Sequence, residues 1–470
     1  MKLLRDISLA FIVMTSLGSN SWAQNQTSDK SYNKMAVEAV IWGTPLVTMD
    51  AMRQAYFRDA KAKYNDIVYL ARDWKNQVTT PNSSSIYLYF NYNTTHGPTV
   101  IEIPAAQGGG IFGSIENAWQ RPLADFGPKG EDAGKGAKYL VLPPGYSGPV
   151  PAGYIKVPSD TYNGYSVIRA IPLSNSAEDN QKVMALANKV RVYQLSQSVT
   201  PPKQKFIDMR ERLFDGIARY DSTFFSRLSA VINEEPILEG DRALMEKFKM
   251  LGLEKGKDLA IGERKADFSA AAGEAQNLFK KEMVNAIVPW TERSHWGQSP
   301  SGMVGAKTGF SFKKADGIDH MSRAVTYYMA CAPPKKLGEA SVYIGGFKDA
   351  QGVPFDGNNT YQLTVPANVP AEQFWAVNVY DLDTAGFIRN SPKVGVDSYN
   401  PKLVKNPNGT VDIFFGAKPP MGKEPNWIYT APGRNWFAFF RMYGPKPGAK
   451  NWRLPDIEKI PTMPQAQAAK

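Results

Sequence analysis

Acidic side chains beside a tryptophan form the first group in this chain that could do chemistry. The segment GSIENAWQRPLADFGPKGED (113–132) places Glu116, Asp125 and Asp132 around Trp119. Two carboxyl groups about 5–10 Å apart can share the acid and base roles of glycoside hydrolysis, and an aromatic ring suits a saccharide. We therefore take Glu116, Asp125 and Asp132 as candidate catalytic residues and Trp119 as a candidate ligand-binding residue. The alternative is that these acids only shape turns.

An aromatic stretch near the C-terminus offers a second candidate surface. In NWFAFFRMY (435–443), successive side chains alternate between two apolar faces, which is typical of a central strand buried on both sides. Arg441 interrupts one face and needs a carboxylate or several carbonyl partners, because an unpaired buried charge is costly. The strand's end could form a ligand-binding rim with Trp427, Arg434, Arg441 and Tyr443, whereas core packing alone would also explain the strand.

Motifs of the common catalytic classes are absent from the sequence. There is no GxSxG elbow and no Walker-type phosphate loop. The single cysteine, Cys331, excludes an internal disulfide and a cysteine zinc cluster. Asp381 and Asp383 supply only two carboxylates, whereas a calcium loop needs six or more oxygens. The three histidines lie far apart, so we predict no metal site and no cofactor: His96, His295 and His320.

The N-terminus has the pattern of a secretory signal peptide. Lys2 and Arg5 precede an apolar stretch from Ile7 to Leu17, and Ser21-Trp22-Ala23 resembles a small-x-small cleavage site. The stretch is shorter than the roughly 20 apolar residues of a membrane-spanning helix, and no later segment reaches that length. We predict cleavage after Ala23 and a soluble protein that is periplasmic or secreted.

The charge balance favours anionic partners over nucleic acid. The net charge is +11, and much of the excess lies in residues 401–470. For an exported protein, suitable partners are lipopolysaccharide, acidic polysaccharide or phospholipid head groups, while a solvated lysine-rich surface is the alternative. No nucleic-acid-binding motif is present, so we predict no nucleic-acid partner.

The elements that must position these residues alternate between helices and strands. Residues 24–34 are polar and predict disorder, and the helical pattern of 35–60 breaks at Gly43-Thr44-Pro45, which predicts two short helices. Runs such as SIYLYFNYN, TVIEIP and KYLVLPP predict strands between Val78 and Pro172. Residues 178–285 carry helical spacing, and strand signals resume near Arg323. No repeat of fixed period is evident.

This order of elements predicts a mainly β protein with a helical section, in the α+β class. We expect two β-sandwich, jelly-roll-like domains that helices join or cover. Asn408-Gly409 predicts a two-residue hairpin before TVDIFF. The predicted divisions are a signal peptide, an N-terminal helical segment, an N-terminal β domain, a helical section, a C-terminal β domain and a tail: 1–23, 24–62, 63–177, 178–322, 323–460 and 461–470.

Several motifs, in order, resemble a known family pair. FWAVNVYDLDTAGFI, NPNGTVDIFF and PNWIYTAPGRNWFAFFRMYGPKPG resemble the domain of unknown function numbered 1214. TTPNSSSIY, HGPTVIEIP, GKGAKYLVLPPGY and YSVIRAIP resemble its usual N-terminal companion, the domain of unknown function numbered 1254. The resemblance covers most of the chain and implies a bacterial exported protein of two β domains. It implies no activity.

The resemblance also selects residues and marks two departures. Six residues match family motif positions and join the candidate ligand-binding set, with turn formation and inter-strand bonding as the alternative for each: Asn82, Tyr87, Arg169, Trp427, Arg441 and Tyr443. The family usually carries an acid and a threonine after the PN pair, where this chain has Ser84 and Ser85. A tryptophan–serine pair of the family appears here as Trp375-Ala376. An altered or lost activity would follow if the missing acid were catalytic.

Three classes of function remain open from the sequence. The first is an exported envelope protein that binds a saccharide or another anionic small molecule, for which the aromatic content of 12% and the basic C-terminal region argue. The second is a hydrolase or lyase that uses the acidic segment 114–132. The third is a structural protein that assembles as a homo-oligomer through its helical section.

Overall fold

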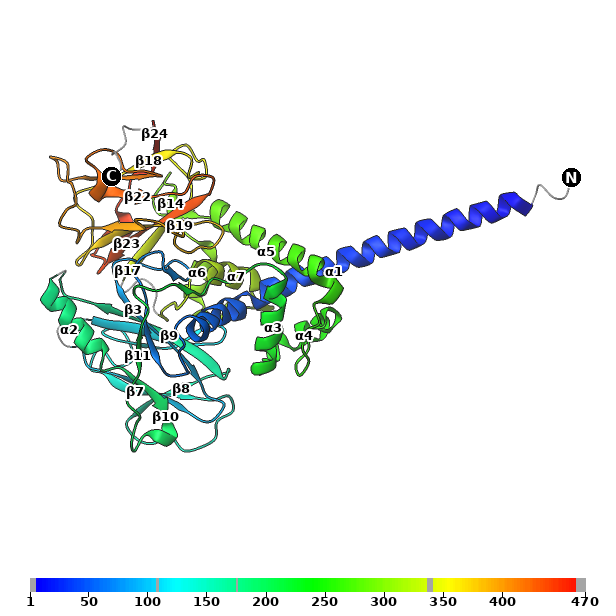
Figure 1. The fold of residues 1–470 in the computed structure, drawn as a ribbon, viewed down its shortest axis with the longest axis horizontal. Coiled ribbons are helices and arrows are strands. Elements are labelled where there is room, and N and C mark those ends of the chain that lie inside the picture. The colour runs from blue at the N-terminus through cyan, green and yellow to red at the C-terminus, as the bar shows by residue number, and fades with distance from the viewer. Residues whose placement is uncertain (1–5, 107–109, 175, 336–340, 462–470) are drawn as a thin grey trace.

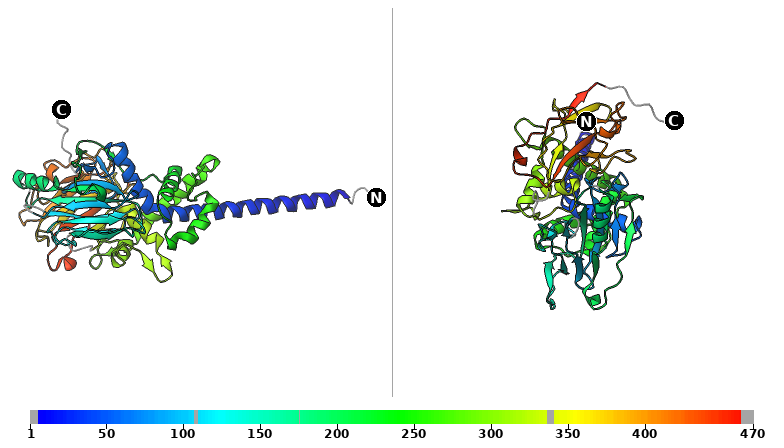
Figure 2. Two further views of the ribbon diagram at one scale, coloured as in Figure 1. Left: turned by 90° about the horizontal axis from the view of Figure 1, so that it is seen from below. Right: turned by 90° about the vertical axis from the view of Figure 1, so that its left-hand side faces the viewer.

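The computed structural model describes residues 6–106, 110–174, 176–335 and 341–461. In Figure 1 these residues form two β domains, one above the other, with helices between them and along one side. Figure 2 shows the same body from two other directions and the first helix leaving it at one end. The arrangement confirms the predicted α+β class with more than one β domain.

Helices occur at both ends of the N-terminal β domain and in the segment that connects it to the C-terminal β domain. No helix among the described residues is long and apolar enough to cross a membrane. Their bounds are α1 (Asp6–Arg58), α2 (Ala177–Ala187), α3 (Ser222–Glu234), α4 (Arg242–Phe248), α5 (Lys265–Asn285), α6 (Pro300–Lys307) and α7 (His320–Met329).

Helix α1 corrects two predictions. It runs without a break through residues 24–34, which we expected to be disordered, and through Pro45, where we expected a break. Pro45 lacks the N–H that an interior helical residue donates, so the turn around it needs other support. The carbonyl of Pro45 accepts a hydrogen bond from Gln120 Nε2 at 2.8 Å, and Thr44 Oγ1 donates to the carbonyl of Val40 at 2.8 Å. Tertiary packing of a buried segment therefore outweighs the local preference of proline.

The N-terminal β domain is a sandwich of a six-stranded and a four-stranded sheet. Between the two sheets lies a core that includes Leu88, Phe90, Ile101 and Val141. The six-stranded sheet has the order β11 (Phe206–Asp208), β1 (Ile67–Tyr69), β3 (Ile86–Asn93), β9 (Asn163–Ile171), β5 (Gly110–Asn117), β6 (Pro122–Phe126). The four-stranded sheet has the order β10 (Arg191–Gln194), β4 (Thr99–Ile103), β7 (Ala137–Leu142), β8 (Tyr154–Pro158).

The C-terminal β domain repeats this plan. Its core includes Ile344, Leu363, Val377 and Phe440. The six-stranded sheet has the order β13 (Val288–Pro289), β14 (Trp296–Gln298), β17 (Ser341–Gly346), β23 (Trp436–Tyr443), β19 (Trp375–Asp381), β20 (Gly395–Asp397). The four-stranded sheet has the order β22 (Trp427–Tyr429), β21 (Val411–Gly416), β18 (Thr360–Val365), β24 (Glu458–Ile460).

Two short ribbons complete the sheets and lie outside both sandwiches. Each pairs two strands of two residues: β2 (Asn76–Gln77) with β12 (Phe214–Asp215), and β15 (Lys313–Lys314) with β16 (Gly317–Ile318).

The two β domains are structural duplicates, which the sequence alone did not reveal. The run β3-β9-β5-β6 in one large sheet corresponds to β17-β23-β19-β20 in the other, and β10-β4-β7-β8 corresponds to β24-β18-β21-β22. The one parallel pair of each small sheet also coincides, β7 with β8 and β21 with β22. On β9, Arg169 lies between Tyr87 and Phe112, and on β23 Arg441 lies between Tyr343 and Ala376. Arg169 and Arg441 are therefore equivalent positions.

A third core joins the helices to both large sheets. It contains side chains of α1, α3, α5 and α7, together with Tyr89 and Val167 from one sheet and Phe437 and Phe439 from the other. Those residues occupy the sheet faces that point away from the sandwich cores. The same faces carry Arg169 and Arg441, because residues two apart on a strand share a face.

Some local predictions were wrong. The segments 191–194 and 206–208 lie in strands β10 and β11, although they fell within the region that we predicted to be helical. Helix α7 occupies residues 320–329, where we expected strands to resume. The Asn408-Gly409 turn forms, with Gly409 N donating to the carbonyl of Asn406, but β21 pairs with β18 and β22 instead of a preceding hairpin strand. The predicted cleavage after Ala23 stays a prediction.

Candidate functional site

Five of the eight candidate ligand-binding residues meet at the boundary between the two β domains. They are Asn82, Tyr87 and Arg169 from the N-terminal domain and Arg441 and Tyr443 from the C-terminal domain. Four of them, with two tyrosines that the sequence did not single out, form a cluster that we call the paired-arginine centre: Arg169, Arg441, Tyr87, Tyr343, Tyr380 and Tyr443. Asn82 is bound to Tyr443 at its edge.

Arg441 is held firmly within this centre. Its side chain is 2% exposed, and it lies on the fourth strand of its six-stranded sheet, as its sequence pattern predicts. Nη1 donates to Asn378 Oδ1 at 2.9 Å and to the hydroxyl of Tyr380 at 2.5 Å, and Nη2 donates to the carbonyl of Thr80 at 2.9 Å. The guanidinium carbon lies 4.9 Å from the ring centre of Tyr343, within cation–π range. Neutral acceptors therefore hold this charge.

Arg169 is held much more loosely. Its Nη2 reaches the carbonyl of Ala332 only at 3.5 Å, and its buried Nε has no hydrogen-bond partner in the described chain. The guanidinium lies 5.9 Å from the ring centre of Tyr87, the neighbouring residue on β3. The side chain is partly exposed, so most of its donors remain available for a ligand.

The phenol of Tyr343 lies under the influence of both arginines. Burial raises the pKa of this phenol, but the charges of Arg169 and Arg441 outweigh burial, and the pKa lies below its ordinary value. The same two charges act on Tyr87, where burial dominates and the pKa is raised. Because both guanidinium groups act on the same two phenols, they share one small region at the domain boundary.

The segment 79–85 forms the wall between this centre and the edge of the C-terminal sheet. Besides Thr80, which binds Arg441, it carries Asn82, whose Nδ2 donates to the hydroxyl of Tyr443. Ser83 Oγ accepts from Asn378 Nδ2 at 2.8 Å, and Ser84 Oγ donates to Asp397 Oδ2 at 2.6 Å. At Ser84 the family resemblance led us to expect an acid, and here its hydroxyl meets the carboxylate of Asp397.

The positive charge of the centre lacks a bound carboxylate. In the part of the chain that the structure describes, neither Arg169 nor Arg441 forms an ion pair with an acidic side chain. A buried cation without a counter-charge is costly, and the attraction of buried Arg441 and half-buried Arg169 for an anion is strengthened where water is largely excluded. Guanidinium groups bind carboxylate and phosphate oxygens through paired hydrogen bonds. The arrangement can therefore hold an anion.

The three candidate catalytic acids have different roles. Glu116 is fully buried, and neither carboxyl oxygen has a hydrogen-bond partner among the described residues. Burial, reinforced by Asp125, raises the pKa of Glu116 well above its ordinary value, and Arg169 lowers it only in part. Asp125 accepts from Ser114 Oγ at 2.7 Å and from Lys335 N at 3.0 Å. Asp132 accepts from the amides of Gly127 and Gly136, which makes it a turn-forming residue.

Three other candidates lie away from the centre. Trp119 packs edge-on against Trp42 at 5.2 Å, beside a cavity of about 20 Å³ that has room for one water molecule. Trp427 is buried and donates to the carbonyl of Gly416 at 2.9 Å. Arg434 pairs with Asp381, so that neither side chain is available to Arg441. These three remain structural in this arrangement.

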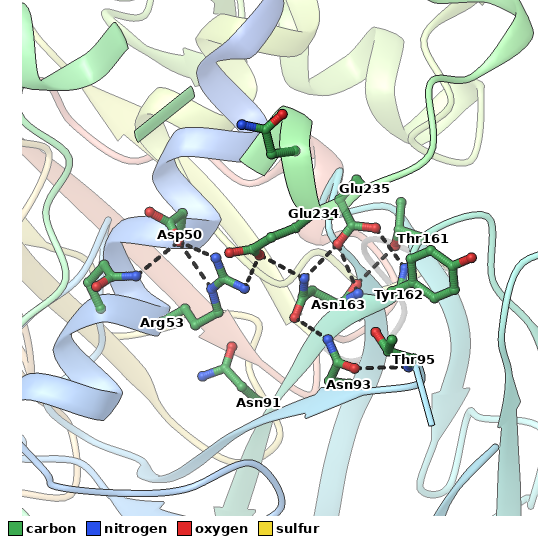
Figure 3. Close-up of polar contacts among 12 residues, drawn as sticks. Asp50, Arg53, Asn91, Asn93, Thr95, Thr161, Tyr162, Asn163, Glu234 and Glu235 are labelled. Carbon is green, nitrogen blue, oxygen red and sulfur yellow. Dashed lines mark hydrogen bonds and ion pairs between the residues drawn. The ribbon is translucent and has the colours of Figure 1, made fainter. Parts of the chain in front are cut away.

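A second polar network, drawn in Figure 3, contrasts with the centre because its arginine is paired with carboxylates. Arg53 of α1 pairs with Asp50 at 2.6 Å and with Glu234 of α3 at 2.5 Å. Glu235 accepts from the backbone of Tyr162 and from both the backbone and side chain of Asn163, at 2.7 to 2.9 Å. The network clamps α1 and the end of α3 onto the start of β9. Its geometry serves the fold.

No group of side chains in the described ranges could hold a metal ion. Asp383 pairs with Lys280 at 2.8 Å, so the acidic turn considered for calcium is neutralised by a lysine and by Arg434. Cys331 is partly buried, and burial raises the pKa of its thiol to about 11. A thiol with this pKa is a poor nucleophile at neutral pH.

A short sequence repeat points to Tyr343, which was not among the candidate residues. Ser341-Val342-Tyr343 repeats Ser85-Ile86-Tyr87, and each tyrosine pairs with the arginine of the equivalent strand. Tyr380 and Asn378 lie on β19 and share a face with Arg441. Only the pairing register shows that these segments are equivalent.

The fold and the centre define a class of protein, a tandem of duplicated β-sandwich domains with an arginine–tyrosine cluster between them. Residues 64–194 match the family described as "Protein of unknown function (DUF1254)", and residues 340–447 match "Protein of unknown function (DUF1214)". The chain therefore belongs to the paired DUF1254/DUF1214 proteins, as the motifs in its sequence predict. No curated protein matches it.

Two solved structures resemble the whole chain. The VPA0106 protein from Vibrio parahaemolyticus is 16% identical, with a TM-score of 0.52, and the match covers 91% of this chain and 100% of that one. A putative uncharacterized protein from Burkholderia cenocepacia is 10% identical, with a TM-score of 0.41 and coverage of 94% and 97%. The first likeness supports the fold alone.

Proposed function

We propose that this chain is an exported protein that binds an anionic small molecule, such as a sugar acid or another carboxylate, between its two β domains. The observation that carries the proposal is the paired-arginine centre: Arg169 and Arg441 act on the same phenols and have no acidic partner in the described chain. A bound carboxylate would supply the missing negative charge and accept from the free donors of Arg169.

Export is supported by the N-terminal pattern of Lys2 and Arg5, an apolar stretch and Ser21-Trp22-Ala23. Mass measurement of the protein purified from its own cells tests this part. A chain that starts at Gln24 is the expected result, and a chain that keeps its first 23 residues would contradict export through cleavage.

Titration calorimetry tests the binding itself. The purified protein is titrated with acetate, citrate, glucuronate, galacturonate, phosphate and the neutral sugar glucose. We expect at least one anion to bind, and Arg169→Met to weaken that binding about 30-fold or more, since truncating one partner of a buried charge pair costs about 2–5 kcal/mol. Arg293→Met serves as the control, because Arg293 is exposed and remote from the centre. Equal affinity in wild type and Arg169→Met would refute the proposal.

A catalytic role is the second candidate, and Tyr343 is the observation that favours it. We infer that its phenol, between two guanidinium groups, could remove a proton from the carbon beside a bound carboxylate, as a lyase requires. The double bond would then form as the β carbon–oxygen bond breaks, and the leaving oxygen would take up a proton. Tyr343→Phe should abolish formation of an unsaturated product from an oligouronide while leaving its binding intact. Product formation at the wild-type rate would exclude Tyr343 as the base.

A further inference from the structure

A separate cleft opens at the edge of the C-terminal sheet, where the two β domains meet. It has a volume of about 330 Å³, within the range of small-molecule sites. The N-terminal domain contributes Arg72, Asp73 and Ser83, and the C-terminal domain contributes the segment 391–397 around β20 and Asn400. Both domains therefore form its walls.

Arg72 and Asp397 line this cleft without pairing with each other. Arg72 is exposed and forms no hydrogen bond or ion pair with the residues that the structure describes. Asp397 attracts Arg72 electrostatically, but the two charged groups are not in contact. The carboxylate of Asp397 already accepts from Ser84 Oγ and Tyr399 N, at 2.6 and 3.0 Å, and retains further acceptor capacity.

The remaining charges leave little preference for an anion or a cation. Asp73 adds a second carboxylate, which pairs with Lys75 at 2.8 Å. Lys393 directs its amino group to the carbonyls of Glu424 and Pro425, at 2.8 and 2.7 Å. One unpartnered guanidinium thus shares the cleft with two carboxylates.

Hydroxyl groups match this combination of neighbours. A guanidinium only donates and a carboxylate only accepts, whereas a hydroxyl does both, so neighbouring hydroxyls can bridge Arg72 and Asp397. Val394 and Val396 add apolar surface beside the polar groups, which suits the C–H faces of a sugar. We propose that the cleft binds a neutral polyhydroxylated molecule of monosaccharide size, held between Arg72 and Asp397.

This site differs from the paired-arginine centre, although the two share a wall. Ser83 lines the cleft and accepts from Asn378, whose oxygen in turn accepts from Arg441. Neither Arg169 nor Arg441 lines the cleft. Variants of Arg72 and of Arg169 therefore separate the two proposals, because Arg441 also supports the shared wall through Asn378.

Saturation-transfer NMR followed by calorimetry with D-glucose, D-galactose, D-mannose and D-mannitol tests the cleft. We expect at least one of these probes to bind, and Arg72→Gln and Asp397→Asn each to weaken it at least tenfold. Asparagine at 397 keeps an acceptor for Ser84, and Arg72 is exposed, so both variants should fold. The control variants Arg293→Gln and Asp316→Asn should bind as the wild type does.

Three results would overturn the cleft proposal. The first is the failure of all four probes to bind at tens of millimolar. The second is unchanged affinity in both Arg72→Gln and Asp397→Asn. The third is a loss of affinity in the controls Arg293→Gln and Asp316→Asn equal to that in Arg72→Gln. Because the anion titration uses other ligands and other variants, either proposal can fail while the other stands.

Discussion

Replacing Arg441 by methionine separates what this arginine does for stability from what it does for binding. The guanidinium donates three hydrogen bonds, to Asn378, Tyr380 and Thr80, and packs over Tyr343. Hydrogen bonds to a charged group contribute about 1.5–3 kcal/mol each. Their loss is opposed by removal of a buried charge, whose desolvation costs several kcal/mol. We therefore expect the ligand-free variant to lose no more than about 2 kcal/mol of unfolding free energy.

Anion binding should respond far more strongly. The loss of one buried cation next to a bound anion costs about 2–5 kcal/mol, which is roughly a 30-fold to several-thousand-fold weaker affinity. An anion at 100 times its Kd should stabilise the wild type by about 2.7 kcal/mol. That corresponds to a rise in melting temperature of roughly 5–10 °C for domains of this size.

Differential scanning calorimetry, with and without the anion that binds the wild type, measures both effects. Arg441→Met should unfold close to the wild-type temperature without anion and should gain almost nothing from the concentration that stabilises the wild type. Equal anion stabilisation in both proteins would refute the reasoning. If Arg441→Met does not fold, Arg169→Met provides the same test, because Arg169 is held less tightly: among the described residues it donates one long hydrogen bond to a carbonyl, at 3.5 Å, and lies against Tyr87.

Four further predictions concern the fold. Burial raises the pKa of Glu116, so its carboxyl stays protonated in the native protein, and the free energy of unfolding falls as pH rises above the pKa of a glutamate in the unfolded chain, near 4.3. Glu116→Gln should remove this loss of stability. Its melting temperature should exceed that of the wild type by an amount that grows from pH 5 to pH 8. Burial, with a nearby arginine, lowers the pKa of His320 to about 4. The unfolded chain therefore binds the proton more readily, and the free energy of unfolding falls as pH drops from about 6.5 to 4. In His320→Asn the melting temperature should change less with pH in that window. A Cβ on Gly164 would lie 2.3 Å from a backbone oxygen, so Gly164→Ala should lower the free energy of unfolding in denaturant by about 1–3 kcal/mol. Gly273 lies in open space on α5, so Gly273→Ala should raise it by about 0.5–1 kcal/mol. Arg53→Met should cost about 1.5–3 kcal/mol by the same assay. Asp50 loses its charged hydrogen bonds to Arg53 but keeps its ion pair with Arg227 at 2.6 Å, and a loss below about 0.5 kcal/mol would show that the α1–α3 clamp is dispensable.

The strands of the two sandwiches could be predicted because their residues carry the pattern locally. β3, β9 and β23 are rich in aromatic and other apolar residues and lie between proline and glycine turns, and such runs rarely suit another element. Helix α1 could not be predicted in full, because its continuity through Pro45 depends on contacts with residues far along the chain, such as Gln120. Strands β10 and β11 are short and lie beside helical sequence, so the spacing of their apolar residues was ambiguous.

Only part of the candidate site could be predicted from the sequence, for a similar reason. The motifs selected Asn82, Tyr87, Arg169, Arg441 and Tyr443 one by one, but Asn82 and Tyr443 are 361 positions apart and only the fold brings them together. The equivalence of Arg169 and Arg441 rests on strand register, which a single sequence does not give. Trp119 and Arg434 carried the same aromatic and basic signals and lie elsewhere.

Native mass spectrometry of the protein purified from its own cells tests the central claim most directly. We predict that the wild type retains one anionic small molecule per chain and that Arg169→Met, prepared in the same way, retains none. A wild type free of any anion that also fails to take up the anions of the titration panel would contradict the account. So would an anion retained equally by the wild type and by Arg169→Met.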